Sequence, residues 1–270
     1  MSERSAVERT VHPSTQTTLS KAFQQLGLSR GDTVLVHASL SSLGWVIGQE
    51  VAVINALLDT LGETGTLMMP AHTAGNSEPS NWENPPIPRS WWPLVREHAP
   101  AYDPRTAPTR GMGRIAELFR TYPGVRRSSH PEVSFAAVGP HAEDLLDNHA
   151  HSPMFGEASP LGALTRHSGK VLLLGVGYDV CTLLHLSEVR AEVRAKKMFG
   201  HAVNIDGVRT WATVSDYDYD DDPFEKIGAD FEAFFPVNKG RVGLAECRLI
   251  DAASLADFGT DWLLKHRDSL

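Results

Sequence analysis

Cysteine is scarce in this sequence of 270 residues, which contains only Cys181 and Cys247. Two cysteines cannot supply a disulfide framework or the usual ligand set of a structural zinc site. Long apolar runs are also missing, because the longest candidates, residues 51–58 and 171–178, fall well short of the ~18–20 residues of a membrane span. Residues 1–18 are polar and lack the apolar centre of a secretion signal. We therefore expect a cytoplasmic protein that does not enter a membrane.

An excess of basic charge is absent as well. The 25 basic and 33 acidic side chains give a net charge of −8, which argues against binding to a nucleic-acid backbone. A negative charge suits an enzyme whose small partner is cationic. Hydrophobic residues make up 41% of the chain, enough for a packed core, so wholesale disorder is excluded. The length favours one large domain.

Strand and helix patterns alternate along much of the chain, and this alternation predicts an α/β layered domain with helices on both sides of a sheet. Thr17 or Thr18 is expected to cap the first helix and Gly27 to end it. Asp251 is the expected cap of the last helix. The predicted strands are residues 32–39, 64–70, 133–138, 170–176, 208–214 and 241–250. The predicted helices are residues 18–26, 49–61, 111–122, 142–149, 179–194 and 251–266.

Residues 71–109 break this alternation. The segment is rich in proline and holds three of the six tryptophans, Trp82, Trp91 and Trp92. Long irregular segments inside a compact domain are usually functional or disordered, and the aromatic content argues against disorder. We interpret the segment as a structured flap over a pocket, with His72 and Trp82 as candidate substrate-binding residues; a packed surface insertion is the alternative.

The best local cluster of reactive side chains lies in residues 181–188. On a helix, Thr182, His185 and Glu188 would follow one another along one face. A histidine with a carboxylate one turn away is a common arrangement for a general base and the group that orients it. A surface ion pair or a satisfied core histidine would give the same pattern. Cys181 could instead form a Cys–His nucleophile, although a buried structural cysteine is the simpler interpretation.

Three loops could bind phosphate or amide oxygens. Residues 37–44 (HASLSSLG) follow the first predicted strand, and α/β sheets place ligands at the carboxyl ends of their strands. Residues 108–113 and 126–131 combine arginine with glycine or serine, although solvated loops have the same composition. Residues 110–115 nearly match the signature of the common acetyltransferase fold, but Ile115 stands where a small residue is required.

Residues 216–222 contain five aspartates. They predict either a solvated acidic loop or a site for a polycationic ligand, and their spacing does not match a calcium-binding EF-hand. His149 and His151 could ligate a metal, but we find no third ligand, so we expect no metal.

These segments occur in an order that resembles the aminoglycoside 3-N-acetyltransferase family of acetyl-CoA-dependent antibiotic N-acetyltransferases. The resemblance implies one acetyltransferase domain over residues 1–270, a three-layer α/β/α sandwich that differs from the common acetyltransferase fold. It also implies acetyl-CoA as co-substrate and a cationic amine as acceptor. The matching segments are VHASLSSLG (36–44), GTLMMP (65–70), NPPIPRSWW (84–92), AYDPRTAPTRGMGRIAELFR (101–120), RRSSHPEVSFAAVG (126–139), SPLGAL (159–164), KVLLLGVGYDVCTLLHLSE (170–188) and SDYDYD (215–220).

The resemblance also implies roles for individual residues. His185 and Glu188 correspond to the family's histidine–glutamate pair, and Asp218 is the best match to its acidic acceptor site. We add a backbone N–H or the Thr73 hydroxyl, near the end of the second predicted strand, as candidate donors to the oxyanion of the tetrahedral intermediate. The implied contacts to acetyl-CoA are His37, Ala38, Ser39, Leu40, Ser41, Arg110, Arg126, Ser128 and Ser129.

The resemblance implies direct transfer of an acetyl group to the 3-amino group of an aminoglycoside, with His185 as general base. A homodimer is a possible assembly. Three other functions stay open. The first is a Cys–His acyltransferase or hydrolase that uses Cys181. The second is a protein that binds CoA or a polyamine without catalysis. The third is an N-acetyltransferase for a non-antibiotic amine such as an amino sugar.

Overall fold

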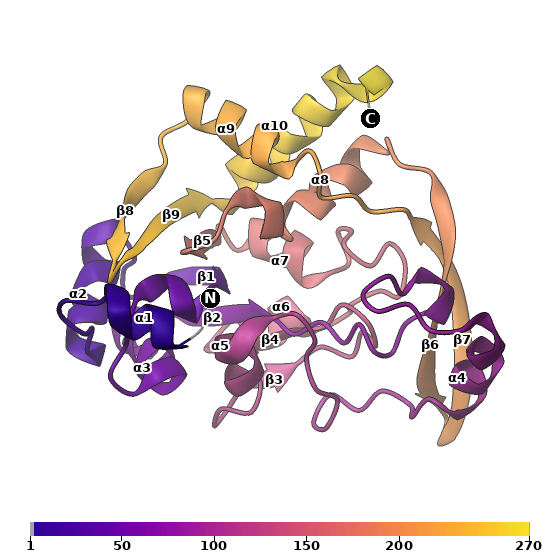
Figure 1. The fold of residues 1–270 in the computed structure, drawn as a ribbon. Helices are drawn as coiled ribbons and strands as arrows, with labels where there is room; N and C mark the ends of the chain where they lie inside the picture. The colour runs from indigo at the N-terminus through magenta and orange to yellow at the C-terminus, as the bar shows by residue number, and fades with distance from the viewer. Residues whose placement is uncertain (1–2, 270) are drawn as a thin grey trace.

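A seven-stranded sheet forms the centre of the computed structural model, which describes residues 3–269 (Figure 1). Three central strands run parallel, and antiparallel strands extend the sheet on both sides. In sheet order the strands are β3 (Arg126–Arg127), β4 (Phe135–Val138), β2 (Thr66–Pro70), β1 (Thr33–Ala38), β5 (Lys170–Leu174), β9 (Ala245–Asp251) and β8 (Asn238–Val242).

Alternate residues of the central strands point to opposite faces of the sheet, so each face has its own core. Val34 and Val36 belong to one apolar cluster, whereas Leu35 belongs to the other. Both faces are covered by helices, and this confirms the predicted α/β architecture. The first cluster packs against α2 (Gln16–Leu26), α3 (Gln49–Leu61) and α5 (Gly113–Phe119), and the second packs against α6 (Ala142–Leu146), α7 (Pro160–Arg166), α8 (Leu184–Ala191), α9 (Phe224–Phe234) and α10 (Ala252–Lys265).

Several local predictions are confirmed at the level of single residues. Helix α3 has the predicted bounds, Gly27 ends α2 in the left-handed conformation, and Asp251 caps α10 by accepting from the Ser254 N–H. The cap of α2 is Thr15 rather than Thr17 or Thr18, because Thr15 and Thr18 exchange side-chain and backbone hydrogen bonds.

Two other predictions are wrong in detail. The predicted strand 241–250 is a hairpin, because Gly243 takes a positive φ of 58° and turns β8 into β9. The predicted helix 179–194 is a 3-10 turn (Tyr178–Val180) followed by the shorter α8.

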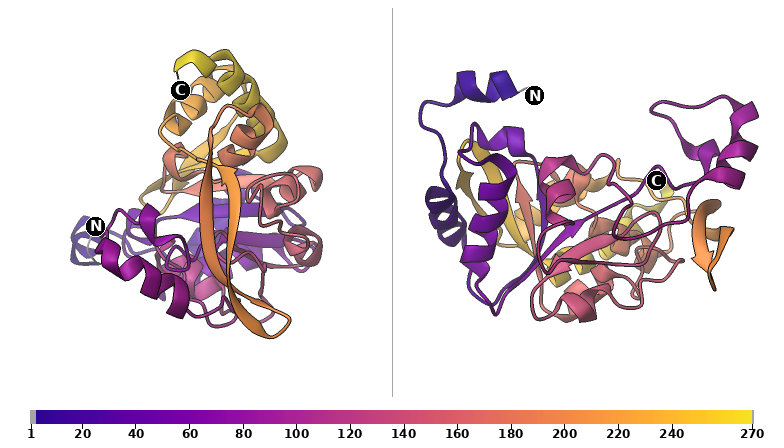
Figure 2. Two further views of the ribbon diagram at one scale, coloured as in Figure 1. Left: turned by 90° about the vertical axis from the view of Figure 1, so that its right-hand side faces the viewer. Right: turned by 90° about the horizontal axis from the view of Figure 1, so that it is seen from below.

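The predicted strand 208–214 pairs outside the main sheet. It is part of β7 (Val208–Tyr217), which forms a long antiparallel hairpin with β6 (Lys196–Ile205). Figure 2 shows this hairpin standing apart from the seven-stranded sheet and next to α4 (Trp92–His98).

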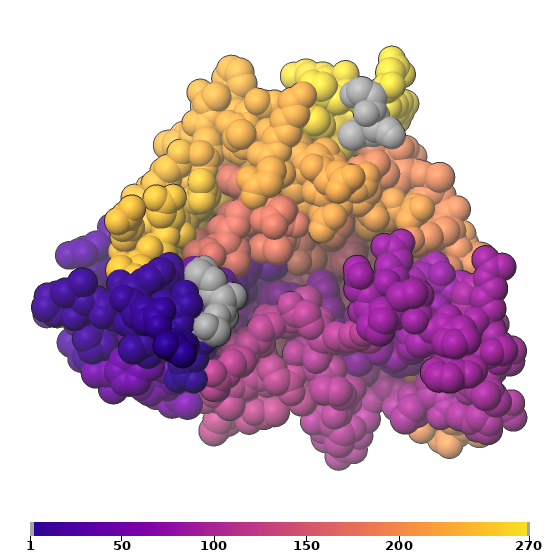
Figure 3. Space-filling view, viewed as in Figure 1, coloured from indigo at the N-terminus to yellow at the C-terminus, as the bar shows by residue number. Residues whose placement is uncertain are grey.

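The flap, residues 71–109, is attached to this hairpin by hydrogen bonds. The Asn76 amide both donates to the Ala202 carbonyl (2.9 Å) and accepts from the Ala202 N–H (2.8 Å). The Tyr102 N–H donates to the same carbonyl, and the Arg209 guanidinium donates to the Ala99 carbonyl. The flap is therefore structured, and it forms one side of the molecular surface (Figure 3), but none of its residues lines the cavity described below.

The first helix among the described residues is α1 (Glu3–Arg9), which the sequence patterns did not predict. The Arg9 guanidinium donates to the Ser41 carbonyl, and this bond holds α1 against the turn that follows β1. Within residues 3–269, no helix has both the length and the apolar character that crossing a bilayer requires.

Candidate active site

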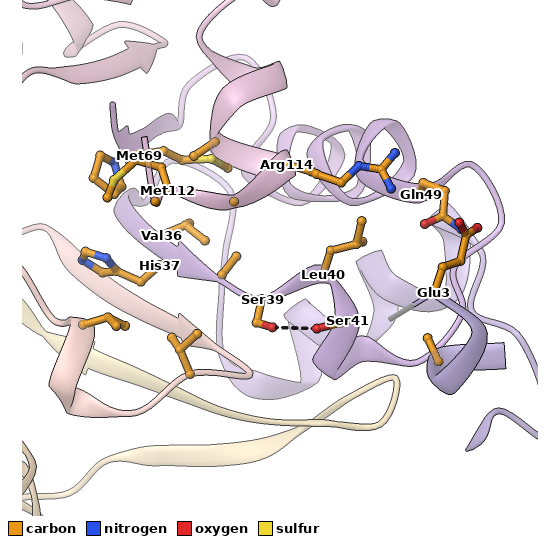
Figure 4. Close-up of a pocket in the computed structure, with 18 of the residues that line it drawn as sticks. Glu3, Val36, His37, Ser39, Leu40, Ser41, Gln49, Met69, Met112 and Arg114 are labelled. Atoms are coloured by element: carbon orange, nitrogen blue, oxygen red, sulfur yellow. Dashed lines mark hydrogen bonds between the residues drawn. The ribbon is translucent and has the colours of Figure 1, made fainter. Parts of the chain in front are cut away.

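A cavity of about 500 Å³ opens at the carboxyl ends of β1 and β2. This is the edge at which α/β sheets bind ligands. Its wall includes all five residues predicted from the turn after the first strand, His37 to Ser41. The start of α5 lines the opposite wall, and α1 contributes Glu3 and Ala6 (Figure 4). We call this cavity the donor pocket.

Small residues let the backbone approach closely around the donor pocket. The Ser39 and Ser41 hydroxyls lie 3.3 Å apart (Figure 4), and Ser42 donates to Ser39. Gly113 has a positive φ of 80° at the start of α5, where a side chain would be strained. The pocket is thus lined by hydroxyls and backbone on the side of the turn, and by Arg114, which is paired with Glu50, on the side of α5.

Four other predicted donor contacts do not line this pocket. Arg110 donates to the Asn84 carbonyl in the flap, and Arg126 forms an ion pair with Glu143. The Ser128 hydroxyl is buried between the Phe135 N–H and His149, and Ser129 is exposed. The family resemblance suggested these residues, but Arg126, Ser128 and Ser129 lie in or directly after β3, the edge strand of the sheet, and Arg110 is turned toward the flap.

His185 and Glu188 form the predicted pair at the start of α8. His185 Nδ1 donates to Glu188 Oε2 at 2.6 Å, and the Glu188 side chain is fully buried. The hydrogen bond fixes the proton on Nδ1, so Nε2 of the imidazole carries the free electron pair. A histidine held in this way can accept a proton from a substrate.

Arg194 completes this arrangement, although no sequence motif pointed to it. Its Nε donates to Glu188 Oε1 at 2.7 Å, and its Nη1 lies 3.1 Å from Asp220 Oδ2. Glu192 ends α8 in the left-handed conformation and turns the chain so that Arg194 returns to Glu188. The buried carboxylate is therefore paired on both oxygens, as a buried charge requires.

Aromatic side chains hold the His185 ring in place. Phe155 stacks on it with ring centroids 4.7 Å apart, while Tyr219 and Phe224 contact it at 5.3 and 4.9 Å. These three residues come from different parts of the chain, so sequence spacing alone could not associate them with His185. Their packing leaves the imidazole few alternative rotamers.

Two further histidines lie close enough to His185 to interact with its charge. Burial, reinforced by His185, lowers the pKa of His37 to about 4 and that of His72 to about 3. Both are therefore neutral near pH 7. His72 packs edge-on against Phe135 and does not line the donor pocket.

The predicted oxyanion donor, Thr73, is also outside the donor pocket. Its hydroxyl oxygen accepts from Arg127 Nη2 at 2.8 Å, and its backbone N–H donates to the Glu132 carbonyl. Trp82 lies farther out in the flap, where its indole N–H donates to the Ser77 hydroxyl. It lines a separate apolar cavity together with Trp91 and Leu94.

The acidic segment 216–222 divides into two parts. Asp216 is fully buried and accepts from the backbone N–H groups of Met154 and Tyr217 and from the Tyr219 hydroxyl. It is a structural residue, so the interpretation of a wholly solvated loop is wrong at this position. Asp218 is half exposed and forms an ion pair with Lys197.

Cys181 is poorly suited to act as a nucleophile. Its side chain is fully buried, and burial raises the pKa of its thiol to about 12. Because the thiolate is the reactive form, almost none is available at neutral pH. The structure therefore disfavours the Cys–His alternative.

The donor pocket at the strand ends and the His185–Glu188 pair, one turn after Thr182 of its wall, together form a candidate site for group transfer. The sequence profile of the aminoglycoside 3-N-acetyltransferase family matches residues 35–264. The chain belongs to this family, and it is therefore an acyltransferase.

Two relatives illustrate the match in sequence. The chain is 42% identical over 261 residues to the SPbeta prophage-derived aminoglycoside N(3')-acetyltransferase-like protein YokD of Bacillus subtilis, covering 96% of each. It is 35% identical to aminoglycoside N(3)-acetyltransferase IX of Micromonospora chalcea, covering 97% of this chain and 98% of that protein.

Solved structures agree. The crystal structure of YokD from Bacillus subtilis matches with a TM-score of 0.96 over 98% of both chains. AAC-IIIb, solved as a binary complex with CoASH, matches with a TM-score of 0.85 at 32% identity, covering 94% of this chain and 98% of that one. AAC-VIa bound to sisomicin matches with a TM-score of 0.85 at 33% identity, covering 94% of this chain and 99% of that one.

Proposed function

We propose that this protein transfers the acetyl group of acetyl-CoA directly to an amine of an aminoglycoside, at the 3-amino position, with His185 as general base. The observation that carries this proposal is the His185–Glu188–Arg194 chain beside the donor pocket. Thr182, one turn before His185, lines that pocket, so a thioester at its inner end would lie near the imidazole.

The donor is acetyl-CoA. Family membership and the CoASH complex of the related AAC-IIIb support this assignment. In this chain, residues 38–41 line the donor pocket, and their backbone and hydroxyl groups are the contacts that we propose for the pantetheine and phosphate portions.

The acceptor is a cationic amine. Support comes from the net charge of −8, from the half-exposed Asp218, and from the sisomicin complex of the related AAC-VIa. Carboxylates attract the ammonium form of such a molecule. An amino sugar that is not an antibiotic carries the same charge, and it is the second candidate acceptor.

The reaction needs one base and no covalent enzyme intermediate. The ammonium group first loses a proton to solvent, and the neutral nitrogen forms a bond to the thioester carbonyl carbon. The carbonyl π electrons move to the oxygen, and His185 Nε2 takes the second proton from nitrogen. When the oxyanion collapses, the C–S bond breaks, and the CoA thiolate leaves and takes that proton. The products are an amide and free CoA.

Glu188 and Arg194 act in this mechanism as positioning residues. Glu188 stabilises the imidazolium that forms when His185 is protonated, because its carboxylate accepts from Nδ1 in both states. Arg194 donates to the second oxygen of that carboxylate and so compensates for its complete burial.

Thiol release from acetyl-CoA, measured against a panel of aminoglycosides and simple amines, tests the proposal. We expect turnover with aminoglycosides that carry a 3-amino group, and a decrease in kcat of about 10²-fold or more in His185→Ala. The exposed His12 offers a matched control, since His12→Ala removes an imidazole that does not line the donor pocket. Wild-type kcat in His185→Ala would refute the proposed base.

A further inference from the structure

Acyl transfer places negative charge on the thioester oxygen, and enzymes stabilise this charge with preorganised hydrogen-bond donors. The sequence suggested Thr73 for this task. In the structure, however, its hydroxyl lies outside the donor pocket and is bonded to Arg127. The donor must therefore be sought among the groups that line the pocket.

His37 is such a group. It is the fifth residue of β1, its side chain is buried with 5% exposure, and it lines the donor pocket. Figure 4 shows its ring at the end of the pocket near Met69, opposite the end formed by Glu3 and Gln49. The strand holds this residue rigidly, because its backbone pairs with Leu173 of β5.

The Nε2 atom of His37 is buried, and it has no hydrogen-bond partner among residues 3–269. Buried polar atoms in folded proteins nearly always have a partner, so an unpaired one beside a ligand pocket points to a ligand. The histidine Nε2–H and the carbonyl oxygen of a thioester are complementary as donor and acceptor.

We propose that His37 is a catalytic residue that donates its Nε2–H to the carbonyl oxygen of the bound acyl thioester. The hydrogen bond strengthens as that oxygen becomes the oxyanion. This role rests on the proposed function, because it assumes that acetyl-CoA occupies the donor pocket.

The electrostatics of the site support a neutral donor. The low pKa of His37 keeps its imidazole uncharged at the pH of the reaction. A cation in this place would repel the ammonium group of the acceptor and would oppose protonation of His185. A neutral imidazole donates a hydrogen bond without either penalty.

His72 provides a matched comparison. It is also neutral, and its Nε2 is also buried and unpaired. It lies between Phe135 and Phe155 rather than on the pocket wall. The two histidines therefore share their burial and charge state and differ in access to the donor.

Infrared spectroscopy of acetyl-CoA labelled with ¹³C at the thioester carbonyl tests the proposal without any acceptor. In the wild-type complex we expect the carbonyl band below its position in free acetyl-CoA, because a hydrogen bond weakens the C=O bond. His37→Phe should return the band to the free position. His37→Gln, which restores an N–H donor, should keep part of the shift, and His72→Phe should keep all of it.

Calorimetric titration with CoA verifies that each variant is folded and binds. The proposal is overturned if the bound wild-type band stays at the free position, or if His37→Phe binds CoA and retains the shift. If His37→Phe does not fold, the test rests on His37→Gln. Complete loss of the carbonyl shift in His37→Gln, which still offers an amide N–H donor, would contradict the proposal.

Turnover gives a second readout. We expect kcat in His37→Phe to fall by about 10²–10³-fold, the effect typical of losing one oxyanion donor, with little change in the KM for acetyl-CoA. A wild-type protein that shows the infrared shift but acetylates no amine in the panel would refute the proposed acceptor and leave the role of His37 intact. A wild-type protein that does not bind acetyl-CoA would refute the proposed function itself.

Discussion

Buried neutral histidines make the stability of this protein depend on pH. The pKa values of His37, His72 and His149 fall to about 4, about 3 and about 4, from a usual value of 6.5, chiefly because of burial. The unfolded chain binds a proton at each site as the pH drops through 6.5, whereas the folded protein does not. Stability is therefore complete above pH 6.5 and is lost as the pH falls toward these lowered values.

The size of the effect follows from proton linkage. Between about pH 7.5 and about pH 5.5, each histidine with such a shift lowers the free energy of unfolding by about 1.3 kcal/mol, so these three lower it by about 4 kcal/mol. Burial also lowers the pKa of His130 and of His151, and these two residues add to the change in the same direction. That is a large share of the ~5–15 kcal/mol that stabilises a typical domain. Carboxylates are mostly ionised in this range, so they contribute little to the change.

Urea unfolding at the two pH values, followed by tryptophan fluorescence, measures the difference directly. His149→Gln should remove about 1.3 kcal/mol of it, and the exposed His12→Gln should leave it unchanged. His149 is the best site for this test, because its nitrogens bond to Ser128 and Met154 rather than facing the donor pocket. Equal stability at both pH values would show that these imidazoles are not held neutral, and an unchanged pH effect in His149→Gln would exclude His149 as a source.

Three further results are expected. Arg194→Met leaves the buried Glu188 without its cation, so it should lower the free energy of unfolding by about 3–5 kcal/mol and reduce kcat. Urea unfolding and thiol release measure these two effects, and both should be smaller in Arg194→Lys. Wild-type kcat in Arg194→Met would contradict the positioning role. Asp218→Asn should raise the KM for a cationic acceptor more than it lowers kcat, whereas an unchanged KM would mean that Asp218 serves only its ion pair with Lys197. Iodoacetamide at neutral pH should not alkylate Cys181, as measured by mass spectrometry, and should leave the activity intact. Alkylation of Cys181 accompanied by loss of activity would restore the Cys–His mechanism.

Local signals in the sequence predicted much of the fold. Helix α3 has regular apolar spacing and a glycine at each end, and its bounds were predicted without error. Strand β6 was missed because Gly200 and His201 interrupt its apolar pattern, and it is defined by pairing with β7. The β8–β9 hairpin looked like one strand because the turn at Gly243 is very short.

Some residues of the candidate site could be predicted from local motifs, whereas others are brought to it only by the tertiary fold. The turn 37–41 and the His185–Glu188 pair are each continuous in sequence, so motifs located them. Arg194 and Phe155 reach His185 only through the tertiary fold, and neither had a local signal. Thr73 lies near the end of β2, as expected, but the interior position of Arg127 decides what its hydroxyl contacts.

The attachment of the flap to the β6–β7 hairpin has a consequence for how new specificities can arise. The donor pocket is built on the ends of the central strands and the histidine–glutamate pair on α8, whereas the flap and the hairpin hold each other through Asn76 and Ala202. Residues in the flap can be varied while the strands and the helix that carry the candidate site stay fixed. A library of substitutions confined to the flap, with Asn76 retained, is therefore the natural starting point for engineering acetylation of other amines.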